Sequence, residues 1–411
     1  MLSTDVIIVG GGMVGALTAA ALGACGVDVV VLEKSAPALF DAGVHDLRVS
    51  AVSEASERML GAVGAWDAIC RMRVCPYRRM LVWESESSAE TLFDSSSIGL
   101  PHLGHIVENR VIQLGLWQQL EAMENVRIVC PGLVERLHVN KQQVIVEGNG
   151  QTYGASLLIA ADGAHSAVRS LARIAVEGQS YEQHALVATV TTSDPQQDIT
   201  WQRFTPNGPQ AFLPLCGHRA SMVWYESAET VSMLKQLPAE EFLRAMETAF
   251  PERLGKLHSL EGIGSFPLQW QHASDYVQPR LALVGDAAHS VHPLAGQGVN
   301  MGLLDAAVLV ECVVEQLAKG GDIGAMRALR RYERWRKPQN SLMIRMLDGI
   351  QQAFQPQQHA AVMGTLRALA LRGADRIRPL NSLCIKLAMG LEGDLPQLAH
   401  GRLPTLSEAA R

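Results

Sequence analysis

The sequence has no pair of cysteines spaced as C-x-x-C, and its seven cysteines are scattered along 411 residues. An odd, scattered set is typical of reduced thiols and argues against a disulfide framework or a zinc site built from cysteines. His289 and His292 lie close together, but no third metal ligand follows at a matching spacing. We therefore expect a cytoplasmic protein that binds no metal ion.

Excess positive charge and long apolar runs are also lacking. The net charge is −6 and the isoelectric point is near 6.1, which argues against a nucleic-acid partner. The apolar stretch 16–32 is interrupted by Gly23, Gly26 and Asp28, so it predicts a helix and a strand and no transmembrane segment. The N-terminus runs straight into an apolar strand, so we expect no secretory signal.

What is present is ample material for a folded interior. Hydrophobic residues make up 48% of the chain and charged residues 18%, a balance typical of ordered globular proteins. A chain of 411 residues is too long for one ordinary core, so we expect two or more domains.

A glycine fingerprint near the N-terminus predicts a nucleotide-binding βαβ unit. An apolar strand at 5–9 is followed by Gly10-x-Gly12-x-x-Gly15, an alanine-rich helix at 16–24 and a second strand at 27–32. These glycines permit a tight turn, close approach of a pyrophosphate and packing of the helix on the strand. Glu33 closes the second strand, where an acid can accept hydrogen bonds from a ribose. The fingerprint alone does not distinguish FAD from NAD.

Two later segments favour FAD. Residues 158–169 form an apolar strand that ends in Asp162-Gly163. Residues 281–302 form a strand that ends in Gly285-Asp286, and a loop of small residues then leads into a helix. Asp286 can accept hydrogen bonds from a ribityl hydroxyl. The new helix presents free N–H groups and a partial positive charge, which favour an anionic reduced flavin.

The remaining chain divides into helical and strand-like patterns. Helical periodicity covers 53–71, 107–123, 239–250 and about 296–317, and it returns beyond Pro338 with breaks near Gln355 and Pro379. Strand-like patterns cover 77–93, 126–159 and 181–225, with turn signals at Asn149-Gly150, 206–209 and 216–217. The basic run 327–337 is interpreted as a solvated helix face, with an anionic membrane or partner surface as the alternative.

Taken together, the three motifs resemble the single-component flavoprotein aromatic hydroxylases typified by para-hydroxybenzoate hydroxylase. The segments at 48–51, 104–109 and 208–215 are more similar still to the hydroxylases of ubiquinone biosynthesis. Those at 75–79 and 200–206 look most like the members that hydroxylate a demethoxy-quinol intermediate. The resemblance covers nearly the whole chain.

This resemblance implies roles for individual residues. Glu33 would bind the adenosine ribose, Arg48 the flavin or its phosphates, and Asn109 the flavin, with Arg110 and Gln113 as alternatives to Asn109. Pro293, Gly296, Gln297 and Gly298 would form the loop that positions the flavin ring, and no general base is assigned. The full set expected at the cofactor is Gly10, Gly12, Gly15, Glu33, Arg48, Asn109, Asp162, Asp286, Pro293, Gly298 and Asn300.

The resemblance also implies an architecture: an α/β protein with a Rossmann-like FAD-binding domain, an inserted β-rich substrate domain and a helical C-terminus. We expect the FAD-binding domain at 1–75, 105–180 and 275–337. The substrate domain would comprise 76–104 and 181–274, and the C-terminal helical region 338–411.

The expected substrates are O2 and a polyprenylated benzoquinol or phenol, which a flavin C4a-hydroperoxide would hydroxylate. Phe212, Leu213 and Pro214 are candidates for the pocket wall, with plain sheet core as an equal alternative. The reductant would be NAD(P)H or another donor bound without a second Rossmann motif. Other chemistry on the same fold, such as prenyl reduction or halogenation, and a non-catalytic FAD-stabilised scaffold remain alternative functions.

Partners among the other ubiquinone-biosynthesis proteins remain open at this point, and so does peripheral contact with the inner membrane. The C-terminal helical pattern carries an apolar set at 342, 343, 346, 347, 350 and 354. This set indicates either a membrane or partner face or a buried bundle.

Overall fold

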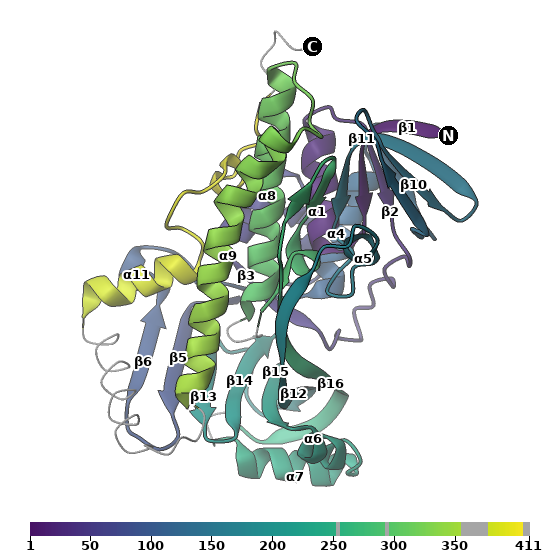
Figure 1. The fold of residues 1–411 in the computed structure, drawn as a ribbon. Coiled ribbons are helices and arrows are strands. Elements are labelled where there is room, and N and C mark those ends of the chain that lie inside the picture. The colour runs from purple at the N-terminus through teal and green to yellow at the C-terminus, as the bar shows by residue number, and fades with distance from the viewer. Residues whose placement is uncertain (252–254, 292–295, 355–376, 406–411) are drawn as a thin grey trace.

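The computed structural model describes residues 1–251, 255–291, 296–354 and 377–405, which form two lobes joined by long strands (Figure 1). The upper lobe in this view contains a sheet of order β17-β18-β11-β1-β2-β8, in which all strands but β17 run parallel. Their bounds are β1 (Leu2–Val9), β2 (Val29–Leu32), β8 (Val126–Val129), β11 (Gln151–Ala160), β17 (Val277–Gln278) and β18 (Leu281–Leu283).

The centre of this sheet is apolar on both faces, as the sequence predicts. Val6 to Val9 are buried and pair with Val29 to Leu32 on one side and with Leu157 to Ala160 on the other. A hairpin of β9 (Arg136–Val139) and β10 (Val144–Gly148) extends from β11. The predicted turn after β10 is present, with positive φ at Asn149 and Gly150.

Three helices build the main core of the upper lobe. They are α1 (Met13–Ala24), α4 (Asn109–Glu121) and α8 (Gln297–Ala318), and α1 contacts both of the others. Because α1 consists largely of alanine and glycine, its neighbours approach its backbone closely, and Gly15 to Gly23 are all buried.

The lower lobe contains an eight-stranded sheet of order β19-β16-β12-β15-β14-β13-β5-β6. The strands are β5 (Arg79–Glu84), β6 (Glu90–Asp94), β12 (Val176–Thr192), β13 (Ile199–Thr205), β14 (Gly208–Leu215), β15 (Arg219–Ser227), β16 (Leu257–Ala273) and β19 (His289–Ser290). Helices α6 (Ala228–Leu234) and α7 (Ala239–Ala249) cover one face of it. The long strands β12 and β16 pair from Val176 and Ala273 onward and connect the lobes.

A small sheet of β3 (Val49–Ser53), β7 (Gly104–Glu108) and β4 (Cys75–Tyr77) lies beside α2 (Glu54–Ala62) and α3 (Trp66–Met72). One sequence prediction was wrong here: the helix expected to begin at Val107 begins at Asn109. Ile106 and Val107 are buried and pair with β3, and this pairing prevents them from joining the helix.

The C-terminal region is helical, with α9 (Met326–Phe354), α11 (Arg378–Ala388) and the short η5 (Gln397–His400). The predicted domain boundary after Lys337 falls inside α9, which continues without a break through Pro338. Proline removes one helical hydrogen bond, yet here the helix continues past it. Pro379 is the second residue of α11, in the first turn, where its missing N–H has no cost.

Candidate functional site

The N-terminal glycine turn has the geometry of a phosphate site. Gly10 has φ of +102°, and a Cβ there would lie 2.3 Å from the carbonyl oxygen of Ala161. A Cβ on Gly15 would lie 1.9 Å from the carbonyl oxygen of Gly10. Gly12, the N-cap of α1, is different because a Cβ on it would meet nothing within 4 Å. The turn is therefore closed towards the sheet and open in front of the N–H groups of α1.

Side chains from neighbouring elements fix this turn. The Gly11 N–H donates to Glu33 at 2.5 Å, and the Gly11 carbonyl accepts from the Trp117 indole at 2.7 Å and from Gln113 at 2.9 Å. Gln113, which the sequence offered as an alternative flavin contact, and Trp117, which is buried in the core, both hold Gly11 in place from α4.

The Asp162 segment lies directly behind the turn. One carboxylate oxygen of Asp162 accepts from the Val168 N–H at 3.1 Å, whereas Oδ1 is buried without a hydrogen-bond partner in the part of the chain described. The Arg169 guanidinium donates to the carbonyls of Ala164 and Ala287. Arg169 thus ties this segment to the Gly285–Ala287 turn, a role that the sequence motif did not reveal.

A cavity of about 380 Å³ lies between the upper lobe and the face of the lower sheet opposite α6 and α7. Upper-lobe segments provide one wall, which includes Arg48, Ser50, Ala51, Asn109, Asp286, Gly296 and Gly298. The sheet provides the other, which includes Met80, Ala185, Val187, Ala211, Leu213, Val223 and Phe266. One wall is thus rich in backbone and polar groups, whereas the facing wall combines these apolar residues with the polar Thr200, Gln202, Ser221 and Gln269.

Asp286, Arg48 and Asn109 meet at the polar wall. The Asp286 side chain faces the open cavity, but protein surrounds it on most other sides, and this desolvation raises the pKa of its carboxyl. Arg48 and His289 partly offset that rise in pKa. Arg48 lies over the ring of Phe266 at 5.2 Å, and the Asn109 carbonyl accepts from the Ser50 hydroxyl at 2.6 Å.

The N-terminus of α8 closes the same wall. Gly296 is its N-cap with φ of +62°, and a Cβ on Gly298 would come no closer than 3.9 Å to its nearest neighbour. Open backbone N–H groups at the start of a 22-residue helix form a site for negative charge.

Comparison with known proteins assigns this arrangement to a family. The family model described as "FAD binding domain" matches residues 3–127 and 134–346. The chain belongs to this FAD-binding family. It is 41% identical to the 3-demethoxyubiquinol 3-hydroxylase of Escherichia coli (strain K12), over 94% of this chain and 99% of that protein. The ubiquinone hydroxylase UbiL of Rhodospirillum rubrum is 36% identical, over 97% of this chain and 92% of that protein.

Solved structures support the fold. p-Nitrophenol 4-monooxygenase PnpA from Pseudomonas putida matches with a TM-score of 0.74 at 19% identity, over 96% of this chain and 99% of that one. The family matches confirm the expected resemblance, the FAD cofactor and the FAD-dependent monooxygenase class, and the structural neighbour confirms the α/β fold.

The residues of this chain fit FAD. The open face of Gly12 and the N–H groups of α1 suit the pyrophosphate, and the partnerless Oδ1 of Asp162 offers an acceptor beside them. The cavity wall formed by Asp286, Arg48 and the N-terminus of α8 suits the ribityl chain and ring. The two groups of residues adjoin each other because Arg169 joins the Asp162 segment to the Asp286 turn.

Not every predicted residue lies in these groups. Pro293 falls outside the described residues. The Asn300 amide is buried and bonds to Ala51, Ser53 and Ser56, so it fastens α8 to β3 and α2. Gln297 reaches the Ala388 carbonyl on α11 at 3.5 Å.

Of the two alternatives left open for residues 212–214, pocket wall and sheet core, Phe212 takes the sheet core. Successive residues of a strand face opposite sides of the sheet, so three in a row cannot share one wall. Leu213 lines the cavity, whereas Phe212 is 2% exposed and stacks on Trp201 in the core beneath α7. Pro214 is buried and takes the same side as Phe212 by this alternation.

A buried polar network supports the Asp286 turn and was missed from sequence. Asp305 of α8 is fully buried, and its carboxylate accepts from the Gly285 N–H at 3.1 Å, His289 at 2.5 Å, Arg336 at 2.7 Å and Asn340 at 3.0 Å. Burial would raise the pKa of Asp305, but His289 and Arg336 hold it well below its usual range. Arg336, predicted to lie on a solvated basic face, is 4% exposed.

None of the helices in the described ranges combines enough length with enough apolar character to cross a bilayer.

Proposed function

We propose that this protein hydroxylates the ring of a polyprenylated benzoquinol or phenol in ubiquinone biosynthesis, with FAD as cofactor and O2 as the source of oxygen. The observation that carries the proposal is the cavity between the Asp286–α8 wall and the facing wall of the lower sheet. The names of the relatives from Escherichia coli and Rhodospirillum rubrum support the substrate class.

Each wall has its own part in the proposed reaction. Asp286 and Asn109 would hold polar edges of the cofactor, and the N-terminus of α8 would stabilise negative charge that develops on its ring. Bound FAD supplies the redox chemistry that activates O2. Leu213, Val223 and the other apolar residues of the sheet would orient the substrate ring and keep water away.

The expected reductant, NAD(P)H or another donor, is part of the same proposal, and no side chain is assigned as a general base. A donor bound without a Rossmann motif of its own would have to reach the cofactor through the cavity or its edge. Reduction of the bound flavin by NADH and by NADPH, measured without O2, distinguishes these donors from others.

The test is product analysis with isotopically labelled O2. Purified protein with bound FAD, supplied with a reductant and a short-chain demethoxy-quinol, should yield a ring-hydroxylated product that carries one labelled oxygen. A Leu213→Trp variant, which fills the cavity, should lose most of this activity and keep its FAD. Met233→Trp is the matched control because Met233 is 57% exposed on α6.

Other outcomes point to different functions. A reduced prenyl chain or a halogenated ring without labelled oxygen would identify other chemistry on the same fold. A scaffold function would be favoured by two results together. The protein would keep its FAD but turn over no quinol, and a variant whose flavin cannot be reduced would still complement ubiquinone synthesis.

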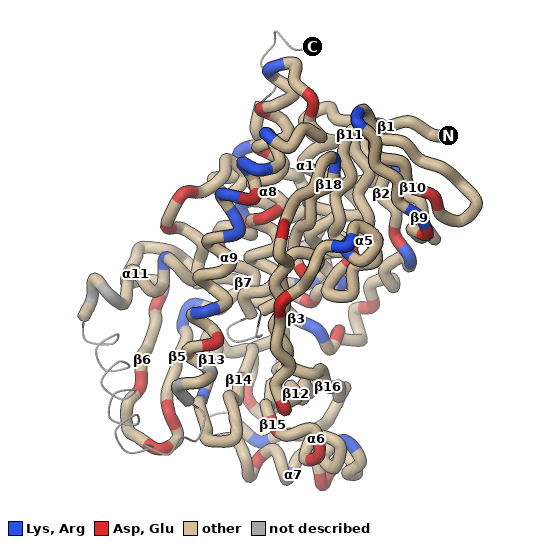
Figure 2. The backbone as a smooth tube through the Cα atoms, viewed as in Figure 1, with Lys and Arg blue, Asp and Glu red and all other residues tan. Residues whose placement is uncertain are grey.

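We further propose that the C-terminal helices bring the protein to the inner membrane, where a polyprenylated substrate is held. Within the predicted apolar set, Leu347 packs on Phe204, while Leu342 and Met346 are 69% and 49% exposed. The Phe354 side chain lies outside what the structure describes. Arg345 is exposed between the two apolar residues, and Lys and Arg recur along α9 (Figure 2). Apolar side chains next to basic ones suit an anionic bilayer surface.

A further inference from the structure

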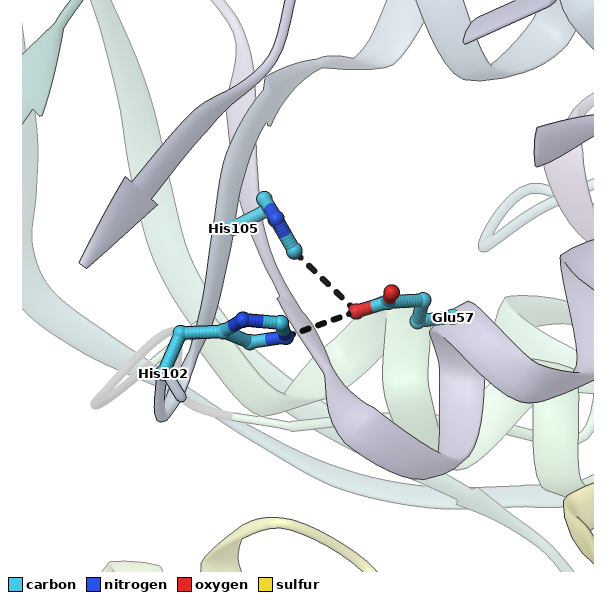
Figure 3. Close-up of side chains that lie close together, drawn as sticks. All are labelled: Glu57, His102 and His105. Carbon is cyan, nitrogen blue, oxygen red and sulfur yellow. Dashed lines mark hydrogen bonds and ion pairs between the residues drawn. The ribbon is translucent and has the colours of Figure 1, made fainter. Parts of the chain in front are cut away.

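Two histidines and a glutamate converge beneath the small sheet, away from the cofactor cavity. Glu57 comes from the first turn of α2, His102 from the loop before β7, and His105 from β7 itself (Figure 3). Glu57 Oε2 lies 3.0 Å from His102 Nε2 and 3.2 Å from His105 Nδ1. Glu54 Oε2 lies 3.4 Å from His102 Nε2.

The hydrogen bonds of this cluster are incomplete. His105 is 8% exposed, and its Nδ1 points at Glu57 but has no hydrogen-bond partner of acceptable geometry among the described residues. A buried imidazole nitrogen without a partner loses its hydrogen bonds to water and gains none from the protein, which is energetically unfavourable. The two imidazole nitrogens and the Glu57 oxygen lie within 4.8 Å of one another, close enough to bind a common cation.

We propose that Glu57, His102 and His105 form a three-ligand site for a divalent transition-metal ion, with zinc as the best match and a water molecule as the fourth ligand. Zinc bonds nitrogen and oxygen at about 2.0–2.1 Å in a tetrahedron, which places neighbouring ligand atoms about 3.3 Å apart. The two separations from Glu57 Oε2 to the histidine nitrogens, 3.0 and 3.2 Å, are close to that edge length, and all three ligand atoms lie within 4.8 Å of one another. Two imidazoles and one carboxylate favour zinc over calcium or magnesium.

Surrounding residues support the ligands. Arg58 binds Glu54 through Oε1, which leaves Oε2 on the side of His102. Trp66 packs edge-on against the His105 ring with 5.1 Å between centroids. The three ligand side chains are between 10% and 21% exposed, so the site is partly shielded and still reachable.

The site would stiffen one wall of the cofactor cavity from behind. It joins α2 to β7, and the Ser53 and Ser56 groups at the start of α2 bind Asn300 of α8. None of the three ligands is among the residues that line the cavity, so the inference does not depend on the proposed function. The expectation of no metal was based on the spacing around His289 and did not consider this cluster, in which Glu57 and His102 are 45 residues apart in the sequence.

The test uses tag-free protein with bound FAD, stripped with a chelator and titrated with zinc and with cobalt(II). We expect one metal ion per chain, visible absorption bands typical of tetrahedral cobalt, and a higher melting temperature with zinc. Glu57→Gln and His102→Gln should each weaken zinc binding at least about tenfold. His258→Gln, an exposed site on β16, is the matched control and should bind like the wild type.

Flavin absorbance and circular dichroism establish that each variant is folded before its affinity is compared. Zinc binding that is equally strong in the wild type and in folded Glu57→Gln would overturn the proposal. So would the lack of stoichiometric binding in the wild type, which would leave an ion-paired cluster that holds a proton instead of a metal.

Discussion

At the scale of single residues, Asp305 organises the part of the site that carries Asp286. Its carboxylate receives hydrogen bonds from the Gly285 turn, from β19 and from two residues of α9. A fully buried carboxylate is tolerated only when its charge is paired and its oxygens are bonded, and both conditions hold here. The position of Asp286 in the cavity wall therefore depends on a residue that does not line the cavity.

Replacement of Asp305 by asparagine should destabilise the protein strongly. The change removes the negative charge and leaves Arg336 and His289 buried without compensation, a loss on the order of 3 kcal/mol in the free energy of unfolding. Urea denaturation of the two proteins with FAD bound measures it. Asp275→Asn, at an exposed position, should change stability by less than about 0.5 kcal/mol. Equal effects of the two changes would contradict the role of Asp305.

The same residue gives a pH dependence of known sign. The pKa of Asp305 is lowered in the folded protein, so its stabilisation is present above the unfolded pKa of about 3.9 and is lost as the pH falls. The stability difference between wild type and Asp305→Asn should be constant above about pH 5 and should shrink in more acidic solution. A difference that grows on acidification would show that the sign is wrong.

At the scale of elements, local motifs were predictable and long-range partners were not. The sequence was enough to predict the glycine turn and the acid after the later strand, at Gly10, Gly12, Gly15 and Asp286. Glycines and a strand-terminal acid at such spacing have few other uses. Arg336 did not, because it lies in a basic run and meets Asp305 across 31 residues of sequence. Burial of that arginine follows from how α9 packs on α8, which no local pattern encodes.

The glycine turn offers a test at this scale. Gly15→Ala places a Cβ 1.9 Å from the Gly10 carbonyl oxygen, so the helix must move away from the strand and FAD affinity should fall at least about tenfold. Gly61→Ala is the matched control because a Cβ there meets nothing within 4 Å in α2. It should raise stability by about 0.5–1 kcal/mol and leave FAD binding unchanged. Bound FAD per chain after gel filtration is the measurement, and full retention in Gly15→Ala would refute the argument.

At the scale of the whole molecule, α9 runs from the upper lobe to the lower lobe and packs against both (Figure 1). Near its start, Tyr332 donates to the Leu283 carbonyl of the upper sheet at 2.7 Å. Further along, Asp348 accepts from Tyr181 of β12 at 2.6 Å, and Leu347 packs on Phe204 of β13. The predicted division after residue 337 therefore lies within a single helix. One rigid helix thus fixes both cavity walls relative to each other and leaves its outer face free.

That outer face is where membrane contact is expected. Leu342→Glu combined with Met346→Glu removes two exposed apolar side chains and adds two negative charges beside Arg345. Both changes oppose contact with an anionic bilayer, so binding to phosphatidylethanolamine–phosphatidylglycerol vesicles in a sedimentation assay should fall at least about tenfold. Leu171→Glu with Met233→Glu adds the same charge at two other exposed apolar positions and should bind vesicles like the wild type. Hydroxylation of a short-chain, water-dispersed quinol should be unaffected in both double variants, because neither touches the cavity. Equal vesicle binding by the wild type and the α9 variant would remove α9 as the contact surface, and the hydroxylase proposal would stand without it.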